Sequence, residues 1–119
     1  MHIKDMAILV HALAEEKGWY DADETENAFI ERACNNLHDE VSELHEAWRN
    51  NKLHSPCDKA DKMTEAGLPV LTCLEEELAD IVIRAFNEAE GLGVDIEGAV
   101  RAKHAFNETR SHRHGGKRS

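Results

Sequence analysis

The sequence has little that favours β-strands or interrupts helices. Only two of its 119 residues are proline and 5% are aromatic, whereas Ala, Glu and Leu are frequent. Strands are enriched in aromatic and β-branched residues, and proline breaks helices. At the length of one ordinary domain, this composition predicts an all-α fold.

Cysteine is also scarce. The three cysteines are an odd number, they form no CxxC motif, and their wide spacing excludes a disulfide framework. We therefore expect a reducing, cytoplasmic location. His54 and Cys57 are three residues apart, but a zinc site would need Cys34 or Cys73 from elsewhere in the chain, so the sequence gives zinc little support.

No hydrophobic run is long enough to cross a membrane. The apolar stretch in MHIKDMAILVHALAEE is interrupted by His11 and followed by acidic residues, and it has no secretory cleavage pattern. The sequence therefore predicts a soluble protein without a membrane partner.

Basic residues are fewer than acidic ones, 14 against 24, which gives a formal net charge of −10. Such a chain should repel DNA, RNA and anionic membranes, so we expect no nucleic acid polymer as a partner. Six of the 14 basic residues lie within positions 101–119. We interpret 1–110 as the folded domain and 111–119 as a basic C-terminal tail that is mobile unless a ligand orders it.

Hydrophobic periodicity and capping signals predict four helices. Thr72 and Asp95 are the expected N-caps of the last two, and Gly18 follows the first. The break between the second and third helices contains Pro56 and Pro69, with at most one short helical turn over 58–65. The four helices are expected over 3–17, 25–51, 72–91 and 95–110.

Two of these helices carry apolar stripes. On the second, Leu37, Val41, Leu44 and Trp48 recur at spacings of four, three and four, which predicts a buried face that includes the Trp48 ring. The third helix is rich in Leu, Ile and Val and should be the most buried.

The same two helices each carry a pair of acidic residues three positions apart: Glu40 with Glu43, and Glu77 with Asp80. This spacing places both members of a pair on one side of a helix, within about 60° of each other. Glu40 lies roughly 70° from the centre of its apolar stripe, at the edge of that stripe, where it can point into a cleft between helices. Glu77 lies roughly 100° from the centre of its stripe, so we expect the second pair to face inward less clearly.

Ligands that are all oxygen suit Mg²⁺, with Mn²⁺ as an alternative. One ExxE pair means little, since 16 glutamates produce about two such matches by chance. Two pairs on consecutive helices favour a shared metal site. A calcium loop starting at Asp21 would need glycine where Glu26 stands, and the Glu-x-x-His pairs of di-iron bundles are absent.

The segments LHDEVSELHEAW, EEELADIVIRAF and KHAFNETRSHRHGGK resemble the MazG-like family of all-α nucleotide pyrophosphohydrolases, and HALAEEKGW is similar to the family's first helix. The family's ExxE and ExxD metal motifs match Glu40/Glu43 and Glu77/Asp80. The spacer between them is longer here, and the excess is the segment 52–71. The resemblance implies a four-helix bundle-like protomer that forms a homodimer or homotetramer.

The resemblance also implies an activity: hydrolysis of (deoxy)nucleoside triphosphates to a monophosphate and pyrophosphate. Lys103, Asn107 and Arg110 match the phosphate-side pattern of the family, and the RHGGK segment contributes Arg113 and Lys117. Physically, Lys and Arg would neutralise phosphate charge and Asn would donate a hydrogen bond.

Three further residues receive roles as hypotheses. We assign Glu43 to orienting the attacking water in a metal-assisted hydrolysis. Trp19 or His38 would recognise the base, since their rings stack on any nucleobase.

Two alternatives remain open. One is a related enzyme of the same superfamily, acting on phosphoribosyl-ATP or deoxyuridine triphosphate. The other is a non-catalytic, dimeric helical module that binds a metal or a protein, in which the carboxylates are a solvated face.

Overall fold

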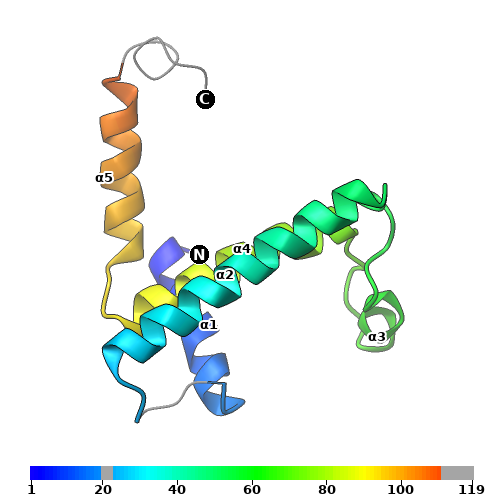
Figure 1. Cartoon of the computed structure of the whole chain (residues 1–119), viewed down its shortest axis with the longest axis horizontal. Helices are drawn as coiled ribbons and strands as arrows, with labels where there is room; N and C mark the ends of the chain where they lie inside the picture. The colour runs from blue at the N-terminus through cyan, green and yellow to red at the C-terminus, as the bar shows by residue number, and fades with distance from the viewer. Residues whose placement is uncertain (20–22, 111–119) are drawn as a thin grey trace.

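Two long helices lying side by side form the body of the molecule (Figure 1). The computed structural model describes residues 1–19 and 23–110. Its helices are α1 (Ile3–Glu16), α2 (Glu26–Arg49), α3 (Ala60–Glu65), α4 (Cys73–Gly91) and α5 (Ile96–Glu108). No strand occurs in the described ranges, which confirms the predicted all-α class.

The helices are arranged around α4. It packs along α2 and also against α1, whereas α5 contacts α1 and the end of α4 and then projects away from the body (Figure 1). Among the described residues, none of α5 packs against α2 or α3. In the described residues α1 and α2 thus pack on α4, and α5 extends beyond them.

Local signals fix where the helices begin. Thr72 Oγ1 accepts a hydrogen bond from Glu75 N at 3.1 Å, and the Glu75 carboxylate accepts one from Thr72 N at 2.9 Å. Asp95 Oδ1 accepts from Gly98 N at 3.0 Å. These side chains satisfy backbone N–H groups that have no partner within the helix, and both predicted N-caps are confirmed.

The segment 52–71 is more ordered than its sequence suggested. It contains α3, so the expected short turn is a fifth helix and the prediction of four helices is corrected. Cys57 N donates to Leu71 O and Cys73 N donates to Ser55 O, both at 2.9 Å. These bonds attach the segment to the start of α4.

The buried core of one chain is small. Phe29 is its largest apolar member, and it packs directly on Gly91, where an added Cβ would lie 2.6 Å from the Phe29 ring. The absence of a side chain at Gly91 lets α2 and α4 approach closely. The other apolar members are Ala7, Ala14, Ala33, Cys57 and Ala89.

The predicted apolar stripe of α2 is only partly buried, which corrects the expectation of a buried face that includes Trp48, whereas α4 has the smallest share of exposed residues among the described helices, as predicted. Val41 and Trp48 on α2 are 52% and 61% exposed, and Leu78 and Val82 on α4 are each 48% exposed. Periodicity identified the apolar faces, but within one chain no further helix covers them. Trp48 is not a core residue here; its ring stacks on His45 with the centroids 5.5 Å apart.

Within the described part of the chain, every helix is too short or too polar to cross a lipid bilayer.

Candidate metal centre

The two predicted carboxylate pairs meet between α2 and α4. One oxygen from each of Glu40, Glu43 and Glu77 can be chosen so that all three lie within 4.8 Å of one another. Glu76, Glu77 and Asp80 form a second group with the same spacing. The structure thus brings all four predicted metal ligands together and adds Glu76 as a fifth carboxylate.

Burial agrees only in part with the helical geometry. Glu40 is 7% exposed, Glu77 and Asp80 are half-buried, and Glu43 is exposed. Glu77 and Asp80 are thus less buried than Glu40, as expected, but more buried than Glu43, because α4 turns this acidic side toward α2 and leaves Leu78 outside.

Buried carboxylate oxygens in the cluster lack hydrogen-bond partners. Glu40 Oε1 accepts from Arg84 Nε at 3.3 Å, but Glu40 Oε2 and Glu77 Oε2 are buried and have no partner among the described residues. Such groups are rare in folded proteins because the water they lose is normally replaced. Their lone pairs are available to a cation in the cluster.

The electrostatics of the cluster also favour a bound cation. Burial and then the neighbouring Glu43 carboxylate raise the pKa of Glu77 to about 7. The pKa of Asp80 is also raised, first by burial and then by the charge of Glu40. Besides burial, the charges of Glu43 and Glu40 disfavour ionisation of Glu77 and Asp80, so a divalent cation would relieve this repulsion.

Arg84 and Glu76 were not identified from the sequence. Arg84 follows Asp80 by four residues and therefore lies on the same face of α4, a spacing that could have indicated it. Glu76 is part of the acidic run Glu75 to Glu77, and no spacing in the sequence distinguishes it from its neighbours. Its carboxylate contacts Lys59 Nζ at 2.9 Å.

A cavity of about 540 Å³ adjoins the cluster at Glu40 and Asp80. Trp19, predicted to contact a base, lines it and is 64% exposed. The cavity combines an apolar wall with charged and amide groups, as small-molecule sites do. Its other members are Val10, Leu13, Ala14, Arg32, Ile83, Arg84 and Asn87.

Asn87 is a polar residue of this cavity that has a hydrogen-bond partner on α1. Its Oδ1 lies 2.8 Å from His11 Nδ1, and this contact fixes the orientation of the side-chain amide. His38, the other residue predicted to contact a base, does not line the cavity and is exposed on α2.

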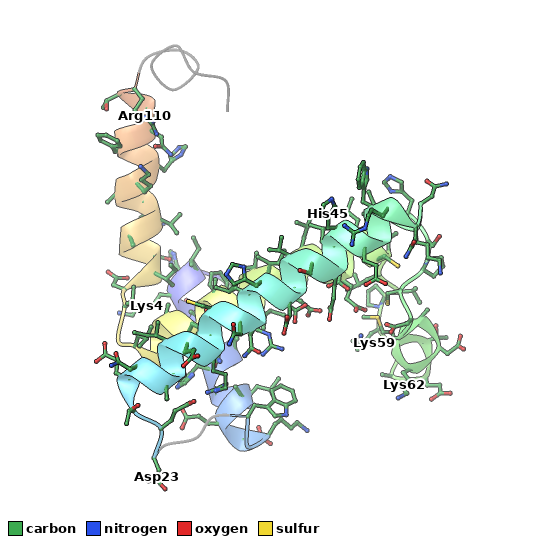
Figure 2. The ribbon with its side chains drawn as sticks, in the orientation of Figure 1. Lys4, Asp23, His45, Lys59, Lys62 and Arg110 are labelled. Carbon is green, nitrogen blue, oxygen red and sulfur yellow. The ribbon has the colours of Figure 1, made fainter. Side chains whose placement is uncertain are left out.

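The predicted phosphate-side residues lie apart from the carboxylates in one chain. Lys103 and Asn107 line a cavity on the surface of α5, and Arg110 lies at the free end of that helix (Figure 2). Arg113 and Lys117, with the rest of the predicted 111–119 tail, lie outside the described residues.

The donors in the cluster determine which metals it suits. Among the described residues, both groups with metal-ligand spacing contain only carboxylates. Oxygen donors match Mg²⁺ and Mn²⁺, whereas zinc in proteins is held mainly by Cys and His.

A comparison of the chain with protein-family models, curated proteins and solved structures finds no match.

Proposed function

We propose that this chain is a Mg²⁺-dependent, MazG-like hydrolase that converts (deoxy)nucleoside triphosphates to a monophosphate and pyrophosphate. The observation that carries the proposal is the convergence of Glu40, Glu43 and Glu77 within 4.8 Å, with buried oxygens of Glu40 and Glu77 left without a hydrogen bond. Solvated acidic residues would not be expected to lose water in this way.

Glu40, Glu43, Glu77 and Asp80 would hold the metal, and Glu76 would complete the carboxylate set. Mg²⁺ or Mn²⁺ in such a site neutralises phosphate charge and lowers the pKa of water. Burial and then repulsion from neighbouring carboxylates raise the pKa of Glu77 and Asp80, and a bound cation would replace that repulsion by attraction.

Each nearby side chain has a role that follows from its position. Arg84 holds Glu40 in place through the 3.3 Å hydrogen bond. Glu43 is exposed, so its carboxylate can accept a proton from a water that reaches the site from solvent. Trp19 would stack on the base in the 540 Å³ cavity, and the Asn87 amide would hydrogen-bond the base edge.

We further propose that the working form is a dimer or tetramer. The apolar side chains exposed on α2 and α4 require a cover that one chain does not supply. A second copy could also bring Lys103, Asn107 and Arg110 to the carboxylates, which these residues do not reach within their own chain.

The test is to incubate the purified protein with a panel of nucleoside triphosphates and Mg²⁺, and to assay pyrophosphate release. Glu40→Gln and Asp80→Asn should each lower the rate by at least about 100-fold, since each removes a charged metal ligand. Trp19→Ala should raise KM while leaving Mg²⁺ binding unchanged.

Glu31→Gln is the matched control, because Glu31 is an exposed glutamate on α2 outside the cluster. It should behave as the wild type. If the wild type cleaves no nucleotide, or if Glu40→Gln and Asp80→Asn retain full activity, the proposed function is wrong. Sedimentation of the wild type as a monomer at assay concentration would contradict the proposed assembly.

A further inference from the structure

A second cavity, of about 370 Å³, borders the carboxylate cluster on the side of the 52–71 segment. Glu43 and Glu77 line it from α2 and α4, and Lys52 and Lys59 line it from the segment. The first cavity reaches the cluster through Glu40 and Asp80 instead. The carboxylates therefore border two separate hollows.

The two cavities differ in chemistry. The 540 Å³ cavity contains Trp19 and an apolar wall, whereas no aromatic side chain among the described residues lines the second one. Lys52, Lys59 and Asn50 line it together with carboxylates of the cluster. Ammonium and amide donors beside a divalent cation suit phosphate oxygens better than a base.

The backbone holds Lys59 in this position. Hydrogen bonds from Cys57 N to Leu71 O and from Cys73 N to Ser55 O attach the segment to α4, and the Cys57 side chain is 5% exposed. Lys59 follows Cys57 by two residues and is the N-cap of α3. Figure 2 shows Lys59 between α3 and the α2/α4 pair.

Lys59 already contacts the cluster. Its Nζ lies 2.9 Å from Glu76 Oε1 and 3.2 Å from Asp58 Oδ1, while its side chain remains 61% exposed. The Glu76 carboxylate belongs to the group with Glu77 and Asp80. A metal bound by that group would compete with Lys59 for Glu76, and the released ammonium could then reach a ligand in the cavity.

We propose that Lys59 and Lys52 bind the phosphate groups that leave as pyrophosphate, so that the 52–71 segment forms the leaving-group side of the site. This inference rests on the proposed function. The bond that breaks joins the α-phosphorus to the bridging oxygen; water adds to the α-phosphorus and gives a proton to the Glu43 carboxylate, and the departing oxygen keeps the electron pair of the broken bond. The two lysines stabilise the negative charge that develops on the leaving pyrophosphate.

The charges around the cavity determine when an anion can bind there. Its acidic residues outnumber its two lysines, so a free anion should be repelled until a divalent cation neutralises the carboxylates. Pyrophosphate binding should therefore require Mg²⁺. The acidic residues that line the cavity are Glu43, Glu46, Asp58, Glu76 and Glu77.

The experiment measures pyrophosphate binding to the full-length protein by calorimetry, with and without Mg²⁺. Lys59→Met and Lys52→Met should each weaken Mg²⁺-dependent binding by about 10-fold or more, since each removes a charge-assisted hydrogen bond to a phosphate oxygen. Lys59→Arg should bind within a few-fold of the wild type. Binding of a nucleoside monophosphate should not change in any of these variants.

Lys62→Met is the matched control, since Lys62 lies on the same segment but on the side of α3 away from the carboxylates (Figure 2). It should bind pyrophosphate as the wild type does. The inference is overturned if Lys59→Met and Lys52→Met keep the pyrophosphate affinity of the wild type. It is also overturned if their affinity for Mg²⁺ falls by the same factor as their affinity for pyrophosphate. Failure of the proposed function would instead be seen as a wild type that releases pyrophosphate from no nucleotide.

Discussion

Replacing Glu77 by glutamine should stabilise the metal-free protein above neutral pH and abolish its stabilisation by Mg²⁺. Burial and the nearby Glu43 raise the pKa of Glu77 from 4.5 to about 7. The folded state therefore retains a proton that the unfolded chain releases. The free energy of unfolding should fall as pH rises from about 4.5 to about 7, and a glutamine at this position does not titrate.

The size of the effect follows from the pKa values. The difference between 4.5 and about 7 corresponds to about 3 kcal/mol, at about 1.4 kcal/mol per pKa unit. Glu77 is only half-buried, so water and salt reduce this to roughly 1–2 kcal/mol. For a domain of this size we expect a rise in Tm of roughly 4–10 °C for Glu77→Gln at pH 8.

The assay is thermal unfolding of the wild type and Glu77→Gln in EDTA at pH 5 and pH 8, followed by addition of Mg²⁺ at pH 8. The Tm of Glu77→Gln should exceed that of the wild type by a small amount at pH 5 and by a large amount at pH 8. Of these two proteins, only the wild type should gain Tm when Mg²⁺ is added. Glu31→Gln, exposed on α2, controls for the loss of one negative charge. An equal advantage at both pH values, or an undiminished response to Mg²⁺, would refute the reasoning.

Three further predictions concern stability. Gly91→Ala should destabilise the protein by about 1–3 kcal/mol in urea unfolding, because the new Cβ would lie 2.6 Å from the Phe29 ring; a stability equal to the wild type would contradict the close packing. Thr72→Ala should lower stability by about 1 kcal/mol through loss of the capping box of α4, and Thr72→Ser should retain most of it. Burial raises the pKa of Glu88 to about 7, and the residue is 9% exposed. Between pH 5 and pH 8 the wild type should therefore lose stability that Glu88→Gln keeps, and parallel pH profiles of Tm would count against this.

The parts of the fold that the sequence predicted depend on neighbouring residues. Thr72 and Asp95 cap their helices through bonds to residues three positions away, so a short window of sequence contained the whole signal. The spacing within each carboxylate pair likewise placed its members on one helical face. These features needed no knowledge of which helix packs on which.

The parts that could not be predicted depend on contacts between distant segments. Lys59 and Glu76 are 17 positions apart, and Arg84 and Glu40 are 44 apart, so only the packing of the chain joins them. Periodicity marked Val41 and Trp48 as apolar positions, but it does not specify what covers them. The projection of α5 away from the body is also set by packing, since its own sequence reads as an ordinary amphipathic helix.

The close contact between Phe29 and Gly91 has a consequence for the proposed metal site elsewhere on the same helices. Glu40 follows Phe29 by 11 residues and Asp80 precedes Gly91 by 11, which is about 16 Å along each helix. Sliding one helix along the other by a single residue would move its carboxylates by about 1.5 Å. If the helix also turned so that its side chains stayed in the same groove, the carboxylates would rotate by about 100° around its axis. The contact between the Phe29 ring and Gly91 therefore sets the register of α2 on α4. The affinity of the proposed site for a metal should therefore depend on the size of the residue at position 91, although that residue lies about 16 Å along the helix from Asp80.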